Sequence, residues 1–84
     1  TAAKPKPALA PLKRKLEAAE AVLARETKEM AEVDEALSDP KLYVRDPAKV
    51  AALNARRAKL ADRLESAEAA WMALAEEYEA ASTD

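Results

Sequence analysis

The sequence predicts an all-α protein, a two-helix antiparallel coiled-coil hairpin with a short helical turn at the tip. The chain has 84 residues and no glycine or cysteine, and alanine, leucine, glutamate, lysine and arginine dominate it. This composition is typical of long or coiled helices. Apolar residues recur at alternating spacings of three and four along two segments, and two Asp-Pro pairs separate these segments. Such spacing predicts two helices that pair along an apolar seam.

Residues 1–8 contain two prolines and two lysines without apolar periodicity, which predicts a linker from an upstream domain. A first helix is expected at about 9–38. Pro11 fits this helix because a proline in the first turn removes an amide that has no helical partner. The predicted seam positions are Leu9, Leu12, Leu16, Ala19, Leu23, Glu26, Met30, Val33 and Leu37. Only Glu26 interrupts the apolar pattern.

The two Asp-Pro pairs predict a turn at 39–46. A residue that precedes proline is pushed out of helical geometry, so the first helix should end near Leu37 or Ser38. Each aspartate can also cap a new helix whose first residue is the proline. We therefore expect a short helical turn from Pro40 and a second long helix from Pro47.

The second helix is expected at about 47–80, with a tail at 81–84. Its predicted seam positions are Val50, Leu53, Arg57, Leu60, Leu64, Ala67, Trp71, Leu74 and Tyr78. Arg57 is the one charged residue among them. Trp71 could stack on a nucleic-acid base, but its position in the seam favours packing in the core. Tyr43, in the turn, could present a recognition surface, although capping the end of the core is the favoured role.

Charge blocks predict that the two helices run antiparallel. Residues 1–15 carry five basic and no acidic side chains, and 16–39 carry eight acidic and two basic ones. Residues 40–63 carry seven basic and two acidic side chains, and 64–84 carry six acidic ones only. A chain that reverses in the turn places opposite charges side by side in both halves. The short connection favours the same arrangement.

Two registers of the seam are compatible with the spacing. The preferred one pairs Val33 with Val50 and brings together the two charged exceptions, Glu26 and Arg57. This pair would lock the register, or would be two long side chains that reach past the seam into solvent. A shift of one heptad remains open, and it places Leu64 opposite Glu26 and Val33 opposite Arg57.

The residue types predict no catalytic, cofactor-binding or metal site in this chain. Without histidine, cysteine or glycine, the chain offers no nucleophile with a histidine base, no phosphate-binding glycine loop and no thiolate or imidazole ligand. It has no apolar run of about 18 residues and no signal-peptide pattern, so we expect a cytoplasmic protein without a membrane segment.

Basic residues are the candidates for binding a partner, although the net charge is -2. One cluster lies where the linker meets the base of the hairpin and comprises Lys4, Lys6, Lys13, Arg14 and Lys15. A second group lies in the turn and along the second helix and comprises Lys41, Arg45, Lys49, Arg56, Lys59 and Arg63. Both could contact phosphates. In the alternative interpretation, nearby acids neutralise the second group, with Glu29 in range of Arg56.

Three segments together resemble the C-terminal coiled-coil domain of ABC-F ATPases of the Uup type. They read Leu-Ser-Asp-Pro-Lys-Leu-Tyr at 37–43, Arg-Asp-Pro-Ala-Lys-Val at 45–50 and Glu-Ala-Ala-Trp at 68–71. The resemblance implies a cytosolic parent ATPase whose upstream domains bind ATP and magnesium. It also implies an accessory domain that binds DNA or RNA, with the ribosome as a further candidate partner.

Two other roles stay open at the level of sequence. The hairpin could be a spacer or protein-interaction arm that positions the ATPase on a ribosome or protein partner. It is expected to be monomeric, but its alanine-rich flanks would permit weak self-association into a four-helix bundle.

Overall fold

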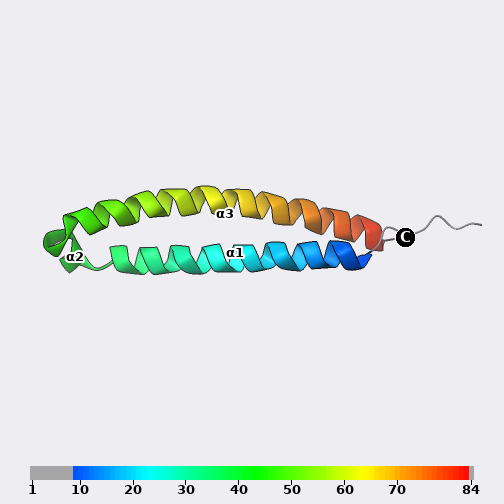
Figure 1. Cartoon of the computed structure of the whole chain (residues 1–84), viewed down its shortest axis with the longest axis horizontal. Helices are drawn as coiled ribbons and strands as arrows, with labels where there is room; N and C mark the ends of the chain where they lie inside the picture. The colour runs from blue at the N-terminus through cyan, green and yellow to red at the C-terminus, as the bar shows by residue number, and fades with distance from the viewer. Residues whose placement is uncertain (1–8, 84) are drawn as a thin grey trace, which may run out of the picture.

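The computed structural model describes residues 9–83, which form three helices: α1 (Leu9–Leu37), α2 (Pro40–Arg45) and α3 (Pro47–Ser82). In Figure 1, α1 and α3 lie side by side in opposite directions, and α2 lies at the tip where the chain reverses. The predicted antiparallel hairpin with a helical turn is therefore confirmed. The expected linker, residues 1–8, lies outside the described residues.

The far end of α3 differs from the prediction. A tail was expected from residue 81, but α3 continues to Ser82. The Ser82 hydroxyl donates a hydrogen bond to the Glu79 carbonyl at 3.1 Å. The backbone amide of Thr83 donates to the same carbonyl at 3.0 Å. These bonds satisfy a carbonyl that would lack a partner at the end of a helix, so the last turn stays helical.

Both Asp-Pro pairs start helices, as the sequence predicts. Asp39 accepts a hydrogen bond from the amide of Lys41 at 3.0 Å and caps α2. Asp46 accepts one from the amide of Lys49 at 3.1 Å and caps α3. In each case the proline occupies the first turn, where its missing amide costs no hydrogen bond.

We expect the substitution Asp46→Ala to lower the free energy of unfolding by about 1 kcal/mol, because it removes the side-chain cap of α3. Urea unfolding followed by circular dichroism measures this change. The exposed Asp62, in the middle of the same helix, provides a control of the same chemistry, and Asp62→Ala should change the stability by less than about 0.5 kcal/mol. Equal losses in the two variants would show that the cap does not stabilise the hairpin.

Tyr43 connects α2 to the end of α1 through a hydrogen bond, but with 48% of its surface exposed it does not cap the core as the sequence favoured. Its hydroxyl donates a hydrogen bond to the carbonyl of Leu37 at 2.8 Å, across the break between α1 and α2. This carbonyl belongs to the last residue of α1, where a helical partner is missing. The apolar contact at the tip comes from the neighbouring Leu42, which is buried.

The core is a narrow seam, as expected of two helices that bury one stripe each. Only three apolar side chains of the described residues are buried: Val33, Leu42 and Leu60. Leu60 is the most enclosed, with 1% of its surface exposed. Glu26 is also buried, with 6% exposed. Stability therefore depends on a few well-packed apolar positions, and one buried carboxylate interrupts them.

The structure adopts the register shifted by one heptad, and the preferred pairing of Glu26 with Arg57 is wrong. Arg57 donates a hydrogen bond to Asp34, the neighbour of Val33, with 2.5 Å between Nε and Oδ1. Glu26 instead lines a groove with Arg63 and other residues of α3. Its Oε1 lies 3.8 Å from Arg25 of its own helix.

The short helix α2 explains this register. It packs beside the first turns of α3, so α1 ends before the tip while α3 extends past the end of α1 (Figure 1). Each seam residue of α1 therefore lies opposite a residue further along α3 than it would if the chain reversed at the middle of the turn.

Candidate nucleic-acid interface

The basic candidates lie on all three helices. Lys13, Arg14 and Lys15 are exposed on the first turns of α1, and Lys41 and Arg45 are exposed on α2. The α3 candidates, also exposed, are Lys49, Arg56, Lys59 and Arg63. Lys4 and Lys6 lie outside the described residues. The two groups expected from sequence therefore begin at opposite ends of the hairpin.

Three of the α3 candidates form a line along one flank of the hairpin. They are seven residues apart and comprise Lys49, Arg56 and Arg63. Seven residues make almost two helical turns and advance about 10.5 Å, so these side chains follow one another on the same side of α3. Lys59 lies three residues after Arg56 and is a neighbour on this side.

The opposing helix continues this line toward the base. Glu29 of α1 pairs with Arg56. Val22, seven residues before Glu29, lines a groove with Arg63. Lys15, seven residues earlier again, therefore lies about one heptad beyond Arg63 on the same flank. We call the residues Lys15, Lys49, Arg56, Lys59 and Arg63 the basic flank.

The fold thus places Lys15, from the cluster at the base of the hairpin, in line with the basic residues of α3. The sequence did not predict this arrangement. Arg25 was not a candidate, but it lies three residues after Val22 and extends the same side of α1. Its place in the heptad pattern was the signal that could have identified it. Lys13 lies seven residues before Glu20, on the other flank of the hairpin.

Ion pairs engage three arginines of the described residues, and one of these is Arg25, which lies 3.8 Å from Glu26. Glu29 pairs with Arg56, as the alternative interpretation expected, and Asp34 pairs with Arg57. The hydrogen bond to Asp34, aided by the attraction between opposite charges, raises the pKa of Arg57 above its ordinary value. The candidates that form no ion pair with another described residue are Lys13, Arg14, Lys15, Lys41, Arg45, Lys49, Lys59 and Arg63. Most of the basic flank is therefore available for an external anion.

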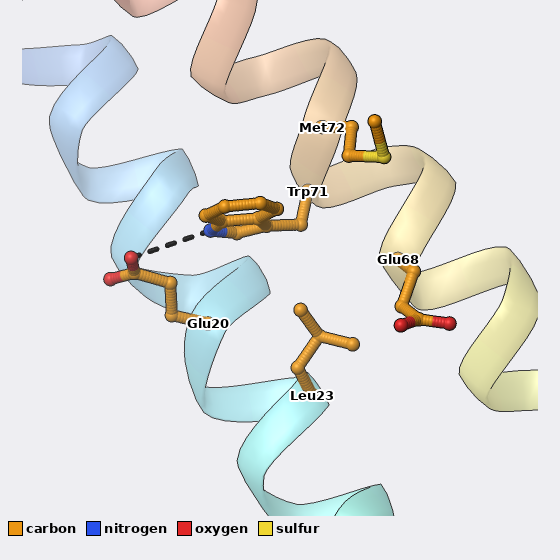
Figure 2. Close-up of a pocket in the computed structure, with 5 residues that line it drawn as sticks. All are labelled: Glu20, Leu23, Glu68, Trp71 and Met72. Carbon is orange, nitrogen blue, oxygen red and sulfur yellow. Dashed lines mark hydrogen bonds between the residues drawn. The ribbon is translucent and has the colours of Figure 1, made fainter.

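Trp71 lies between the two long helices, as its seam position predicts. Figure 2 shows its ring extending from α3 toward α1, above Leu23. The indole nitrogen donates a hydrogen bond to Glu20 at 3.3 Å. The opening beside this ring is acidic, because Glu20 and Glu68 both line it. Stacking on a base at this position would bring phosphates close to carboxylates, which the charges oppose.

Within residues 9–83, no group of three or more acidic side chains is arranged to hold a metal ion. The helices of this part of the chain also include none with the length and apolar character that crossing a bilayer requires.

The fold and its charged surface define the class of this protein, a coiled-coil hairpin domain with one basic flank. Residues 11–76 match the family described as the ABC transporter C-terminal domain. This match spans most of the sequence, and the chain belongs to that family, which is typical of ABC-F and Uup proteins. The domain is thus a part of ABC ATPase proteins. Searches of curated proteins and of solved structures found no match.

Proposed function

We propose that this hairpin is the nucleic-acid-binding accessory domain of a cytoplasmic ABC-F ATPase of the Uup type. The basic flank is the observation that carries this proposal. Its cations recur at about 10.5 Å along a rigid helical surface, and only Arg56 among them has a carboxylate partner within the described part of the chain. Such a line can follow a phosphate backbone without reading base sequence.

The preferred ligand is DNA, with structured RNA, including ribosomal RNA, as the second nucleic acid to test. Phosphate contacts by lysine and arginine account for affinity in either case. The parent protein would hydrolyse ATP with magnesium in its upstream domains, while this domain contributes binding. Lys41 and Arg45 at the tip would add contacts at one end of the line.

Fluorescence anisotropy of labelled duplex DNA and of structured RNA, at about 50 and 200 mM salt, tests the proposal. The triple variant Lys49→Ala, Lys59→Ala and Arg63→Ala should weaken binding by at least about tenfold at the lower salt concentration. It should also reduce the slope of log K against log salt by about two to three, because each lost phosphate contact removes close to one unit.

A matched control removes the same charge elsewhere, through Lys13→Ala, Arg14→Ala and Lys28→Ala. These exposed residues of α1 lie off the basic flank, so the control should weaken binding by less than about threefold. Equal losses in both triple variants would reject the basic flank as the interface. No binding at about 50 mM salt would reject the nucleic-acid function itself.

The second candidate function is a spacer or protein-interaction arm, which the shape of the hairpin favours. The 36 residues of α3 span about 54 Å at 1.5 Å per residue. At the tip, Val44 is 86% exposed and Tyr43 is 48% exposed. An arm that contacts its partner through this apolar tip would bind equally well in the presence of an excess of nucleic acid.

A further inference from the structure

The flank opposite the basic flank contains an open groove of about 310 Å³ between α1 and α3. Its lining residues are Glu20, Leu23, Glu68, Trp71 and Met72. In Figure 2, the indole of Trp71 crosses between the helices, and Leu23 and Glu68 lie on either side of the opening below it. Met72 is 57% exposed, an unusual position for a large apolar side chain in this hairpin. The groove therefore offers an aromatic ring and two aliphatic side chains.

The helix segments that border this groove carry only acidic charges, although Lys13 lies on the same flank seven residues before Glu20. No basic residue occurs between residues 16 and 24 of α1 or between residues 64 and 82 of α3. Glu17 lies three residues before Glu20, and Glu65 lies three residues before Glu68, so each pair shares a face of its helix. Two carboxylates thus line the apolar groove, and two more lie one turn away on the same helix faces. Glu20 accepts one hydrogen bond, which the indole nitrogen of Trp71 donates.

This groove and the basic flank face in opposite directions. Arg63 and Met72 are nine residues apart on α3, which corresponds to two and a half helical turns. A ligand on one flank therefore leaves the other accessible. The two flanks also differ in the sign of their charge, so they select different partners.

We propose that the groove binds a basic amphipathic helix of a protein partner. Apolar side chains of that helix would pack against Leu23, Trp71 and Met72, which is the usual way in which a helix occupies a groove. Its lysines and arginines would lie against the carboxylates, and one of them could contact the face of the indole. Nucleic acid is disfavoured here because its phosphates would meet the four glutamates.

A second copy of this chain is also disfavoured as the occupant. Its complementary surface would be its own basic flank, and the contact would join two unlike faces. Contacts of this kind leave one face of each copy unused and extend into open chains instead of closing into a dimer. Charge complementarity therefore favours a different protein that presents a cationic helix.

Trp71 provides the readout, because it is the single tryptophan of the chain. The probe is a synthetic amphipathic helix of leucine and lysine, which lacks tryptophan, and its counterpart contains glutamate in place of lysine. The lysine peptide should shift and change the intensity of the Trp71 emission in a saturable manner, and the glutamate peptide should have no effect. Titration at about 50 mM salt keeps the charge interactions strong enough to measure.

The variant Glu65→Lys with Glu68→Lys should weaken binding of the lysine peptide by about tenfold or more, since two attractions become repulsions. The control Glu32→Lys with Glu35→Lys makes the same charge change at exposed positions of α1 away from the groove, and it should weaken binding by less than about threefold. Met72→Ala should weaken binding by about threefold through lost apolar contact, which a purely electrostatic attraction would not produce.

Equal weakening in the two double variants, equal binding of both peptides, or no emission change would overturn the proposal. Self-association that competes with the peptide in sedimentation would overturn it in favour of a second copy. The triple alanine variant of the basic flank should bind the lysine peptide as the unmodified chain does. Failure of the peptide experiment and failure of nucleic-acid binding are thus observed separately.

Discussion

Replacing Glu26 with leucine is expected to raise the free energy of unfolding by about 1–3 kcal/mol. Glu26 occupies a seam position and is 6% exposed. Its Oε2 atom has no hydrogen-bond partner among the described residues. Burial of a carboxylate without full compensation destabilises the folded state, whereas leucine at the same spacing would add apolar contact along the seam. Urea unfolding followed by circular dichroism measures the difference.

The exposed Glu32 of the same helix provides the control. Glu32→Leu removes the same charge without filling the seam, so it should change the stability by less than about 0.5 kcal/mol. A Glu26→Leu variant no more stable than the unmodified chain would show that the buried carboxylate is compensated. Sedimentation should accompany the measurement, because a polar residue in a seam can also determine alignment and oligomeric state.

The opposite effect is expected at Leu60, where substitution by alanine should lower the free energy of unfolding by about 2–4 kcal/mol. This side chain is 1% exposed and lies at the centre of the α3 seam. Its truncation removes apolar contact and leaves a cavity that two rigid helices cannot easily close. A small domain has little stability to lose, so the variant should be partly unfolded near physiological temperature.

Val44, an aliphatic residue that is 86% exposed at the tip, is the control for Leu60. Val44→Ala should alter the stability by less than about 0.5 kcal/mol, because no burial is lost. Thermal unfolding by circular dichroism distinguishes the two variants. A Leu60→Ala variant that unfolds at the same temperature as Val44→Ala would contradict the packing described for the seam.

The candidate site was predictable in its residue types and only partly in its arrangement. The seven-residue interval predicted that Lys49, Arg56 and Arg63 share one side of a helix. The proximity of Glu29 to Arg56 was also expected, and it is confirmed. The sequence could not show that Lys15 of α1 continues the same line, because that relation depends on how far one helix is displaced along the other.

The groove around Trp71 was not predicted for the same reason. The position of Trp71 in the seam indicated packing in the core, and the structure places its ring between the helices. Whether a seam residue is enclosed or borders an opening depends on which small side chains lie opposite it. The acidic character of that region was readable from the sequence, where residues 64–84 carry no basic side chain.

By itself, the sequence determined the elements and their direction. Apolar spacing of three and four specifies helices with one buried stripe. Two Asp-Pro pairs end one helix and begin the next two, and alternating charge blocks favour an antiparallel return. These features are local patterns or charges summed over long segments. They can therefore be read from the sequence without knowing the contacts between the helices.

Only the tertiary structure decided the register. A pattern that repeats every seven residues presents nearly the same apolar contacts after a shift of seven, so the spacing cannot distinguish the two alignments. The sequence favoured the alignment that pairs Glu26 with Arg57, but the structure has the other one, in which Arg57 bonds to Asp34 and α2 packs against α3. The burial of Leu42 and the extension of α3 past the end of α1 arise only when the tip is folded. A local sequence pattern therefore cannot predict the register.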